Sequence, residues 1–349
     1  VKNFSQLMVT RFLLGIFESG LFPGIIFYLT KWYKKSEQNY RIGVFFSGAT
    51  IAGAFNGLLA FAITSLDSKY GLNGWQWLFI IDGSATVIVA LFAYYLISDS
   101  VETVSWLTED ERKLAIDRLR LDAGDAHSSH FDKVEIIKAF KDAKIYLSMI
   151  PYFCILVALY SFSFFISTIV NGLGFNIVIS QLLSIPPFVF GCISSVTIAI
   201  LSDRYRIRSP YLMFSMLVSV IGYSLLVVQS NSIALKYTGA CIVGFGLFAG
   251  IPTLLAWLTN NLAGESKRAV GCAMVIACAN IGGIASAQLY TSNDAPDYKS
   301  GHSIALSLLL VGVIFTIIQY YYLKRVNKLK LNDSTKFLKG LSEEKIKHL

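Results

Sequence analysis

The chain has 349 residues, of which 54% are hydrophobic and only 15% are charged. Water-soluble domains carry about 25% charged residues, and the mean hydropathy here is +0.58, so we exclude a soluble globular protein. The lysines and arginines behind the net charge of +8 lie mostly in the segments between apolar runs and in the C-terminal tail. That distribution argues against a basic face for nucleic acid.

Nine apolar runs follow one another along the chain, and each is long enough to cross a membrane as a helix. Such a helix needs about 20 residues to cross hydrocarbon roughly 30 Å thick. The runs are continuous rather than alternating in polarity, which favours helices over the strands of a barrel. They occupy approximately residues 6–28, 42–64, 77–97, 145–169, 179–201, 211–229, 233–258, 269–290 and 303–323. The sequence therefore predicts an all-α, multi-pass integral membrane protein.

Lysine and arginine are distributed unevenly between the segments that join the runs. Alternate segments together hold 25 of them, whereas the intervening segments hold only Lys69, Lys236 and Lys299. Cytoplasmic loops of membrane proteins are enriched in these residues. We therefore expect the 98–144 segment and the basic tail, 324–349, to be cytoplasmic, in a protein of the plasma membrane.

The 98–144 segment has three runs before it and six after it. Many transporters consist of two six-helix halves joined by a loop of this kind. On that plan, residues 1–97 are the last three helices of an N-terminal half, residues 145–323 are a complete C-terminal half, and three further helices precede Val1 in the intact protein.

The central loop contains a helix start signal. Thr108 and Glu111 have the spacing of a capping box, in which each side chain bonds to the other residue's backbone. We expect a short amphipathic helix from Glu109 to about Leu121. The stretch that follows, 122–130, is interpreted as a flexible joint.

The first run carries charged residues at membrane depth. Arg11, Gly15 and Glu18 stand at positions i, i+4 and i+7, so they share one helix face. Charges inside a span are costly and usually face a cavity or a partner. Two interpretations stay open: Arg11 binds an anionic substrate while Glu18 accepts a proton, or the two form a structural ion pair.

Other polar and aromatic residues inside the runs are candidates for lining a substrate path. The fourth run has an aromatic face suited to stacking on a ring-bearing substrate. The alternatives are that the amides bridge helices and that the aromatic rings only pack, and the notion of a substrate path has to compete with both. The candidates are Asn56, Tyr152, Tyr160, Trp257, Asn260 and Asn280.

A short charged turn joins the fifth and sixth runs. It contains Asp203, Arg204 and Arg208. A tight cytoplasmic turn can pair with a neighbouring helix end and hold one conformation shut, so we interpret these residues as a gate. A simple solvated anchor is the alternative.

No set of residues predicts an enzyme, a metal site or a disulfide. The four histidines do not come together with a nucleophile, and the five cysteines fall inside apolar runs without metal-like spacing. We therefore expect neither a cofactor nor a metal ion.

The chain resembles a known family, most clearly in its last third. The motifs are PTLLAW at 252–257, NNLAG at 260–264, KRA at 267–269, NIGG at 280–283 and DAPDY at 294–298, with support from residues 11–18, 74–83 and 106–112. They are similar to motifs of the fungal allantoate permease and nicotinate-type permease group, within the anion:cation symporters of the major facilitator superfamily. Arg206 stands where the superfamily's loop motif has glycine.

The resemblance implies the major facilitator fold, with the nine runs as helices four to twelve of twelve. It implies proton-driven uptake of organic anions such as allantoate, ureidosuccinate or nicotinate-like acids. It also implies that Arg11 acts in substrate binding and that Glu18 acts in binding and in proton coupling.

We therefore predict a monomeric, proton-coupled symporter of small carboxylates that works by alternating access. Its partners are the substrate anion, protons and the lipid bilayer. Two alternatives stay open. In one, the chain as given lacks three helices and is a transport-inactive fragment; in the other, it is a non-transporting membrane sensor of the same ligands.

Overall fold

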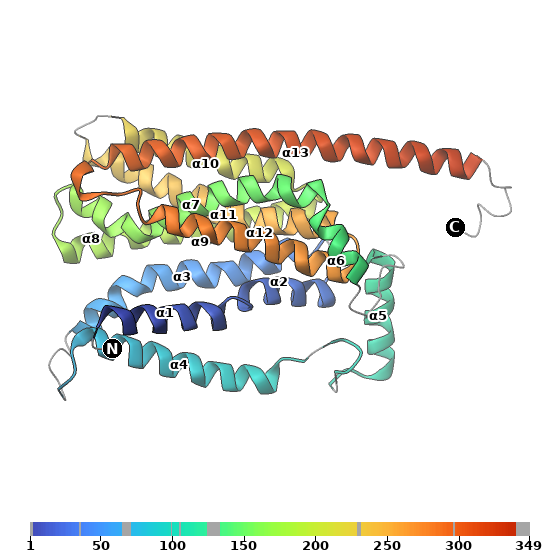
Figure 1. Ribbon diagram of the computed structural model, residues 1–349, viewed down its shortest axis with the longest axis horizontal. Coiled ribbons are helices and arrows are strands. Elements are labelled where there is room, and N and C mark those ends of the chain that lie inside the picture. The colour runs from blue at the N-terminus through green and yellow to red at the C-terminus, as the bar shows by residue number, and fades with distance from the viewer. Residues whose placement is uncertain are drawn as a thin grey trace.

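The computed structural model describes residues 3–34, 36–64, 71–98, 100–104, 106–123, 133–228, 232–295 and 297–339. Within these ranges the regular structure is helical, with no β-strand, as the sequence predicts (Figure 1). The helices are α1 (Phe4–Glu18), α2 (Leu21–Trp32), α3 (Gln38–Thr64), α4 (Gly74–Leu96), α5 (Glu109–Ala123), α6 (Lys133–Phe140), α7 (Ala143–Gly172), α8 (Ile177–Leu183), α9 (Ile185–Tyr205), α10 (Ser209–Val227), α11 (Ile233–Asn261), α12 (Glu265–Ser286) and α13 (Lys299–Lys339), with a 3₁₀ turn at Ser292–Asp294.

Eight helical segments in the described part of the chain are long and apolar enough to cross a membrane. α1 and α2 together make the first of these, and α8 continues into α9 to make another. The predicted run at 42–64 forms α3, a helix of 27 residues. The apolar runs of the sequence therefore correspond to long helices in the structure.

The first span is interrupted in its middle. α1 ends at Glu18 and α2 begins at Leu21. Pro23 explains the interruption, because a proline has no N–H to donate to the carbonyl four residues earlier, which belongs to Ser19. Hydrogen bonding resumes on the far side, where the Gly24 N–H donates to the Gly20 carbonyl over 2.9 Å.

α11 lies at the centre of the C-terminal helices and packs against α7, α9 and α10. Its contact with α10 depends on the absence of a side chain at Gly246, where an added Cβ atom would lie 2.2 Å from Ser219 Oγ and 2.5 Å from the Ser215 carbonyl oxygen. Small residues permit this kind of close backbone approach in membrane bundles. The backbones of α10 and α11 therefore lie close together at Gly246.

α3 makes most of the contact between the N-terminal helices and the C-terminal ones, and α2 adds a smaller contact with α12. α3 packs along α9 and also touches α11 (Figure 1). A Cβ atom at Gly43 would lie 2.8 Å from the Ala199 Cβ, and one at Gly53 would lie 2.7 Å from the Phe188 ring. Glycine at these two positions lets α3 and α9 approach closely.

Several loops rich in lysine and arginine meet at one end of the bundle, which we call the basic end. The contacts that join them are Glu37 with Arg118, Gln38 with Thr259, Tyr40 with Asp203, Asp142 with Lys267, and Lys144 with the Asn261 carbonyl. α5, α6 and the far part of α13 lie on this side in Figure 1.

The predicted helix of the central loop is present as α5, which begins at Glu109 as expected. The Thr108 N–H donates to Glu111 Oε2 over 3.0 Å, and the Glu111 N–H donates to Thr108 Oγ1 over 3.4 Å. Hydrogen bonds from the Thr108 backbone and hydroxyl lower the pKa of the Glu111 carboxyl. Most of the expected joint, 124–130, lies outside the described residues.

Two helical stretches were not expected. α6 is a helix of eight residues inside the 98–144 segment, where the sequence predicts only one helix, near residue 109. α13 has 41 residues and continues to Lys339, so the first part of the predicted basic tail is an extension of the last span rather than a separate segment.

Candidate functional site

A cavity of about 1100 Å³ lies between the N-terminal helices α1, α2 and α3 and the C-terminal helices that face them. Its walls are mostly aromatic and aliphatic, with polar groups at a few positions. The polar side chains that line it are Glu18, Ser19, Tyr152, Tyr160, Ser163, Ser167, Gln181, Ser184 and Asn280. Glu18 is the one charged side chain among the described residues of this lining.

The interruption of the first span places Glu18 at this cavity. Glu18 is the last residue of α1, and Ser19, Leu21 and Pro23 beyond it also line the cavity. Discontinuous helices with binding groups at their broken ends are common in transporters. The Pro23 break thus brings a carboxylate and irregular backbone to the same place.

A polar pair on the opposite wall comes from α7 and α12. The Tyr160 hydroxyl donates to Asn280 Oδ1 over 3.0 Å. Phe164, one turn further along α7, stacks on Tyr160 with ring centroids 5.8 Å apart and an interplanar angle of 15°. Tyr152, two turns earlier, is 1% exposed. This wall combines a flat aromatic surface with an amide.

Aromatic rings lie between the two groups of helices deeper in the cavity. Phe248 of α11 contacts Phe46 of α3 with ring centroids 6.3 Å apart, and Phe188 of α9 at 5.6 Å. All three rings line the cavity. Of the three, Phe46 is the ring closest along its helix to the basic end, six residues after Tyr40 in α3.

Polar contacts between α3, α9 and α11 close the basic end. Asp203 Oδ2 accepts the Tyr40 backbone N–H over 2.6 Å, and Asp203 also forms an ion pair with Arg208. Arg208 is only 6% exposed. Thr259 Oγ1 donates to Gln38 Oε1 over 3.3 Å. A buried charge pair with added hydrogen bonds is costly to break by removing one partner.

The cavity gathers four of the eight predicted substrate-binding residues, Glu18, Tyr152, Tyr160 and Asn280. Arg11 is not in its lining; the guanidinium instead lies over the Phe79 ring, 5.0 Å from the centroid. Trp257 is 7% exposed within α11, and Asn260 also lies outside the lining. The side chain of Asn56 lies outside the described residues.

Of the three predicted gating residues, the structure brings Asp203 and Arg208 together, and Arg204 is exposed. Their partner Tyr40 was missed, because its backbone N–H carries no signal in a sequence. Ser163 and Ser167 were also missed. Their spacing of three and seven residues from Tyr160 places all three on one face of α7, and that signal was available.

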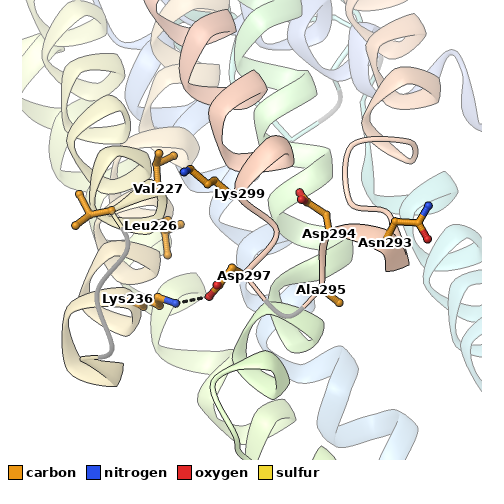
Figure 2. A pocket seen from close by; sticks show the side chains of 9 residues that line it. Leu226, Val227, Lys236, Asn293, Asp294, Ala295, Asp297 and Lys299 are labelled. Atoms are coloured by element: carbon orange, nitrogen blue, oxygen red, sulfur yellow. Dashed lines mark hydrogen bonds and ion pairs between the residues drawn. The ribbon is translucent and has the colours of Figure 1, made fainter.

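A smaller hollow of about 260 Å³ lies at the other end of the bundle (Figure 2). Lys236, in the first turn of α11, pairs there with Asp297 over 2.5 Å. Asp294 accepts the Ser300 N–H over 2.8 Å, and hydrogen bonds from Ser300 lower the pKa of Asp294. These contacts fix the turn that leads into α13.

Long apolar helices around a cavity with few polar groups define a multi-pass integral membrane protein. The family model described as Major Facilitator Superfamily matches residues 1–287. The chain therefore belongs to the major facilitator superfamily.

Known proteins similar to this chain carry transporter names. An uncharacterized transporter of Schizosaccharomyces pombe is 36% identical over 328 residues, which are 94% of this chain and 66% of that protein. The high-affinity nicotinic acid transporter of Saccharomyces cerevisiae is 27% identical over 95% of this chain and 61% of its own length. The chain thus spans about two thirds of the length of such relatives. Transporters of this superfamily are a non-enzymatic class of protein.

A solved structure shows the same fold. The proton:xylose symporter of the superfamily, bound to 6-bromo-6-deoxy-D-glucose, matches with a TM-score of 0.63 and 14% identity over 85% of this chain and 66% of that one. At this identity the likeness concerns the fold alone. The major facilitator fold predicted from the sequence is confirmed.

Proposed function

We propose that the chain is the main part of a proton-coupled symporter of small organic anions in the plasma membrane, with its basic end in the cytoplasm. The specific expectation is a carboxylate of the allantoate, ureidosuccinate or nicotinate-like type. The observation that carries the proposal is the cavity whose single charged lining residue, in the described part of the chain, is Glu18. The nicotinic acid transporter among the relatives supports the substrate class.

Glu18 gives a simple electrostatic reason for coupling. In a site of low dielectric, two negative charges a few ångströms apart repel by several kcal/mol. A substrate carboxylate therefore enters the cavity when Glu18 carries a proton, and an ionised Glu18 excludes it. Anion and proton bind together and leave together, which is the requirement for symport.

The opposite wall supplies contacts for the anion. Because the oxygen of Asn280 accepts from Tyr160, its amide N–H groups can donate to a carboxylate. The stacked pair of Tyr160 and Phe164 offers a face for a planar ring. These groups would orient the substrate, and Glu18 would supply the proton dependence.

Alternating access requires the closed basic end to open. We propose that Asp203 and Arg208 are the gate and that the present structure has the cytoplasmic side closed. The N-terminal half-bundle, of which residues 1–97 are the last three helices, and the C-terminal half-bundle, residues 145–323, would then move against one another along the α3–α9 contact; the 98–144 loop joins them.

The decisive experiment replaces Glu18 with Gln in cells that express the intact gene and lack other uptake of nicotinate. Gln is permanently neutral, so we expect Glu18→Gln to lose accumulation driven by a pH gradient while exchange of labelled for unlabelled nicotinate continues. Glu109→Gln, on the exposed part of α5, is the matched control and should behave as wild type. Accumulation by Glu18→Gln with an unchanged dependence on the pH gradient would contradict the proposal.

A second substitution tests the contacts of the anion. Asn280→Asp adds a carboxylate beside Tyr160, so we expect the apparent affinity for nicotinate to fall by at least about tenfold. Asn280→Gln keeps an amide and should fall less. Equal affinity in Asn280→Asp and wild type would place the anion elsewhere.

Arg11 needs a separate test, since its guanidinium lies over Phe79 rather than in the cavity. If Arg11 binds the carboxylate in another conformation of the transport cycle, Arg11→Lys cripples uptake, because a point charge does not replace a bidentate fork. Unchanged uptake kinetics in Arg11→Lys would reject a role for Arg11 in substrate binding, and its cation–π contact with Phe79 would then be its only assigned interaction.

A further inference from the structure

The short helix α6 sits at the basic end with one side held by protein. It packs against α12, and Ala139 is fully buried. Glu135 Oε2 accepts the Lys267 N–H over 3.4 Å. These contacts fix the rotation of α6 about its axis, so its other side has a defined direction.

The opposite side of α6, with the residue that follows the helix, mixes apolar and basic side chains. At 3.6 residues per turn, they fall within one continuous arc of less than half the helix circumference. Val134, Ile137 and Phe140 are 55%, 57% and 53% exposed. The members of this α6 arc are Lys133, Val134, Ile137, Lys138, Phe140 and Lys141, all exposed.

Neither water nor hydrocarbon alone suits this composition. Water would leave three large apolar side chains unburied, and hydrocarbon would surround three ammonium groups. The boundary between lipid headgroups and acyl chains suits both, because lysine extends its charged end to the headgroups while its stem lies along apolar surface.

The position of α6 along the bundle fits that boundary. α7, the span that follows, begins at Ala143. In its first turn Tyr146 is 47% exposed, and its hydroxyl donates to the Phe140 carbonyl over 2.8 Å. Tyrosine is enriched where spans enter the headgroup region. The α6 arc therefore continues the exposed side of α7 at the depth where that span starts.

We propose that the α6 arc is a binding surface for anionic phospholipids of the leaflet at the basic end. Val134, Ile137 and Phe140 lie among the first carbons of the acyl chains, and Lys133, Lys138 and Lys141 contact the phosphate and carboxylate groups of the lipids. Lipid bound here holds α6 in place against α12, at the start of the C-terminal helices. This surface is independent of the substrate cavity and of the proposed transport reaction.

The depth of the arc is measured first, on the intact protein in phosphatidylcholine vesicles containing phosphatidylserine. Its cysteines are replaced by alanine, and a spin label is attached at Ile137→Cys. We expect faster relaxation of the label with oxygen, which concentrates in lipid, than with a water-soluble nickel chelate. Lys113→Cys, on the exposed side of α5, is the control and should show the reverse. A label at Ile137 accessible mainly to the nickel chelate would overturn the proposal and favour an acidic protein as the partner.

The charge of the lipid is tested second. Each lysine near an anionic surface is worth about a fivefold preference for anionic lipid. We expect the double variant Lys138→Gln and Lys141→Gln to lower the ratio of phosphatidylserine to phosphatidylcholine bound to the purified protein several-fold. Lys113→Gln with Lys299→Gln removes the same charge elsewhere and should leave that ratio near wild type. An equal ratio in the two double variants would overturn the assignment of anionic headgroups.

Discussion

α11 at the centre of the C-terminal helices and two N-terminal spans, the first span and α4, are similarly apolar but differ in how much of them other helices of the chain cover. In the most apolar stretch of α11, 83% of the residues are buried by other helices; in the first span the share is 6%, and in α4 it is 0%. The hydropathies of these stretches are 2.0, 1.8 and 1.8. Hydropathy therefore identifies a span, and it does not tell how much of that span the other helices of the chain cover.

The difference teaches where a side chain is constrained. A residue of α11 has neighbours on all sides at interior packing density, so a change of one methyl group alters the stability of the protein. A residue of α4 has few neighbours within this chain, which spans about two thirds of the length of its relatives, so a substitution there meets little of the described structure. Substitutions matched between the two regions should separate these effects, and the largest should come from the tightest helix contact.

Gly246→Val tests that contact. The added atoms would meet Ser219 and the Ser215 backbone, which cannot move without separating α10 from α11. We expect a loss of about 3 kcal/mol or more of stability, seen as a lower Tm in detergent and loss of the monodisperse peak in size-exclusion chromatography.

Gly83→Val in α4 is the matched control. An added Cβ there has nothing within 4 Å, so the Tm should change little. An equal loss of stability in both variants would contradict the proposed difference in packing between α11 and α4. The loss would then be explained by the lower helix propensity of valine.

Asp142→Asn applies the comparison to the basic end. Asp142 caps α7 by accepting the Lys144 N–H over 2.9 Å, and it pairs with Lys267 over 2.5 Å. Asn keeps the cap but loses the ion pair, in which the side chains are 11% and 19% exposed. We expect a loss of about 1.5 kcal/mol, between exposed and buried pairs. Glu109→Gln, in an exposed pair with Arg112, should cost less than about 0.5 kcal/mol.

The same pair predicts a dependence on pH. Burial alone would raise the pKa of Asp142, but the hydrogen bonds and charge of Lys267, with the Lys144 N–H, lower it below its usual value. Its contribution is therefore complete above the unfolded pKa of about 3.9 and is lost as the pH falls through the lower folded value. The Tm difference between wild type and Asp142→Asn should shrink at acid pH, and a difference that grows there would contradict the assignment.

Arg206→Gly should have a smaller effect than Gly246→Val and Asp142→Asn, and in the opposite direction. Arg206 follows α9 with φ 55° and ψ 25°, a left-handed conformation that glycine adopts without cost. We expect a gain of up to about 1 kcal/mol, measured as a higher Tm. Arg204→Gly, inside the last turn of α9, should instead lower the Tm by a similar amount.

Sequence patterns predicted what depends on neighbours along the chain. Periodicity and hydropathy located the long helices, and the spacing of Thr108 and Glu111 fixed the start of α5. The glycine that the family pattern has at position 206 corresponds to the left-handed turn found there. α6 was missed because two turns of helix are too short to give a distinct periodicity, and its exposed face carries both polar and apolar residues.

Such patterns do not predict contacts between residues that are far apart in the sequence. The hydrogen bond from Tyr160 to Asn280 joins residues 120 positions apart, and the closure of the basic end uses the backbone N–H of Tyr40. Membership of a helix face correctly placed Glu18 at a cavity. The same argument wrongly placed Arg11, seven residues earlier in α1, at the cavity. Whether the Arg11 side chain reaches the cavity or Phe79 depends on how α1 is oriented beside α4, which the sequence does not specify.

The length of α13 has a mechanical consequence. Its 41 residues extend about 60 Å at 1.5 Å per residue, roughly twice the thickness of the hydrocarbon layer. Its first part packs against α7 and α10, and the remainder projects beyond the bundle (Figure 1). By geometry alone, a given rotation of the C-terminal helices would displace Lys339 further than a residue beside the cavity, so a dye attached at Lys339 would be a sensitive reporter of such a rotation.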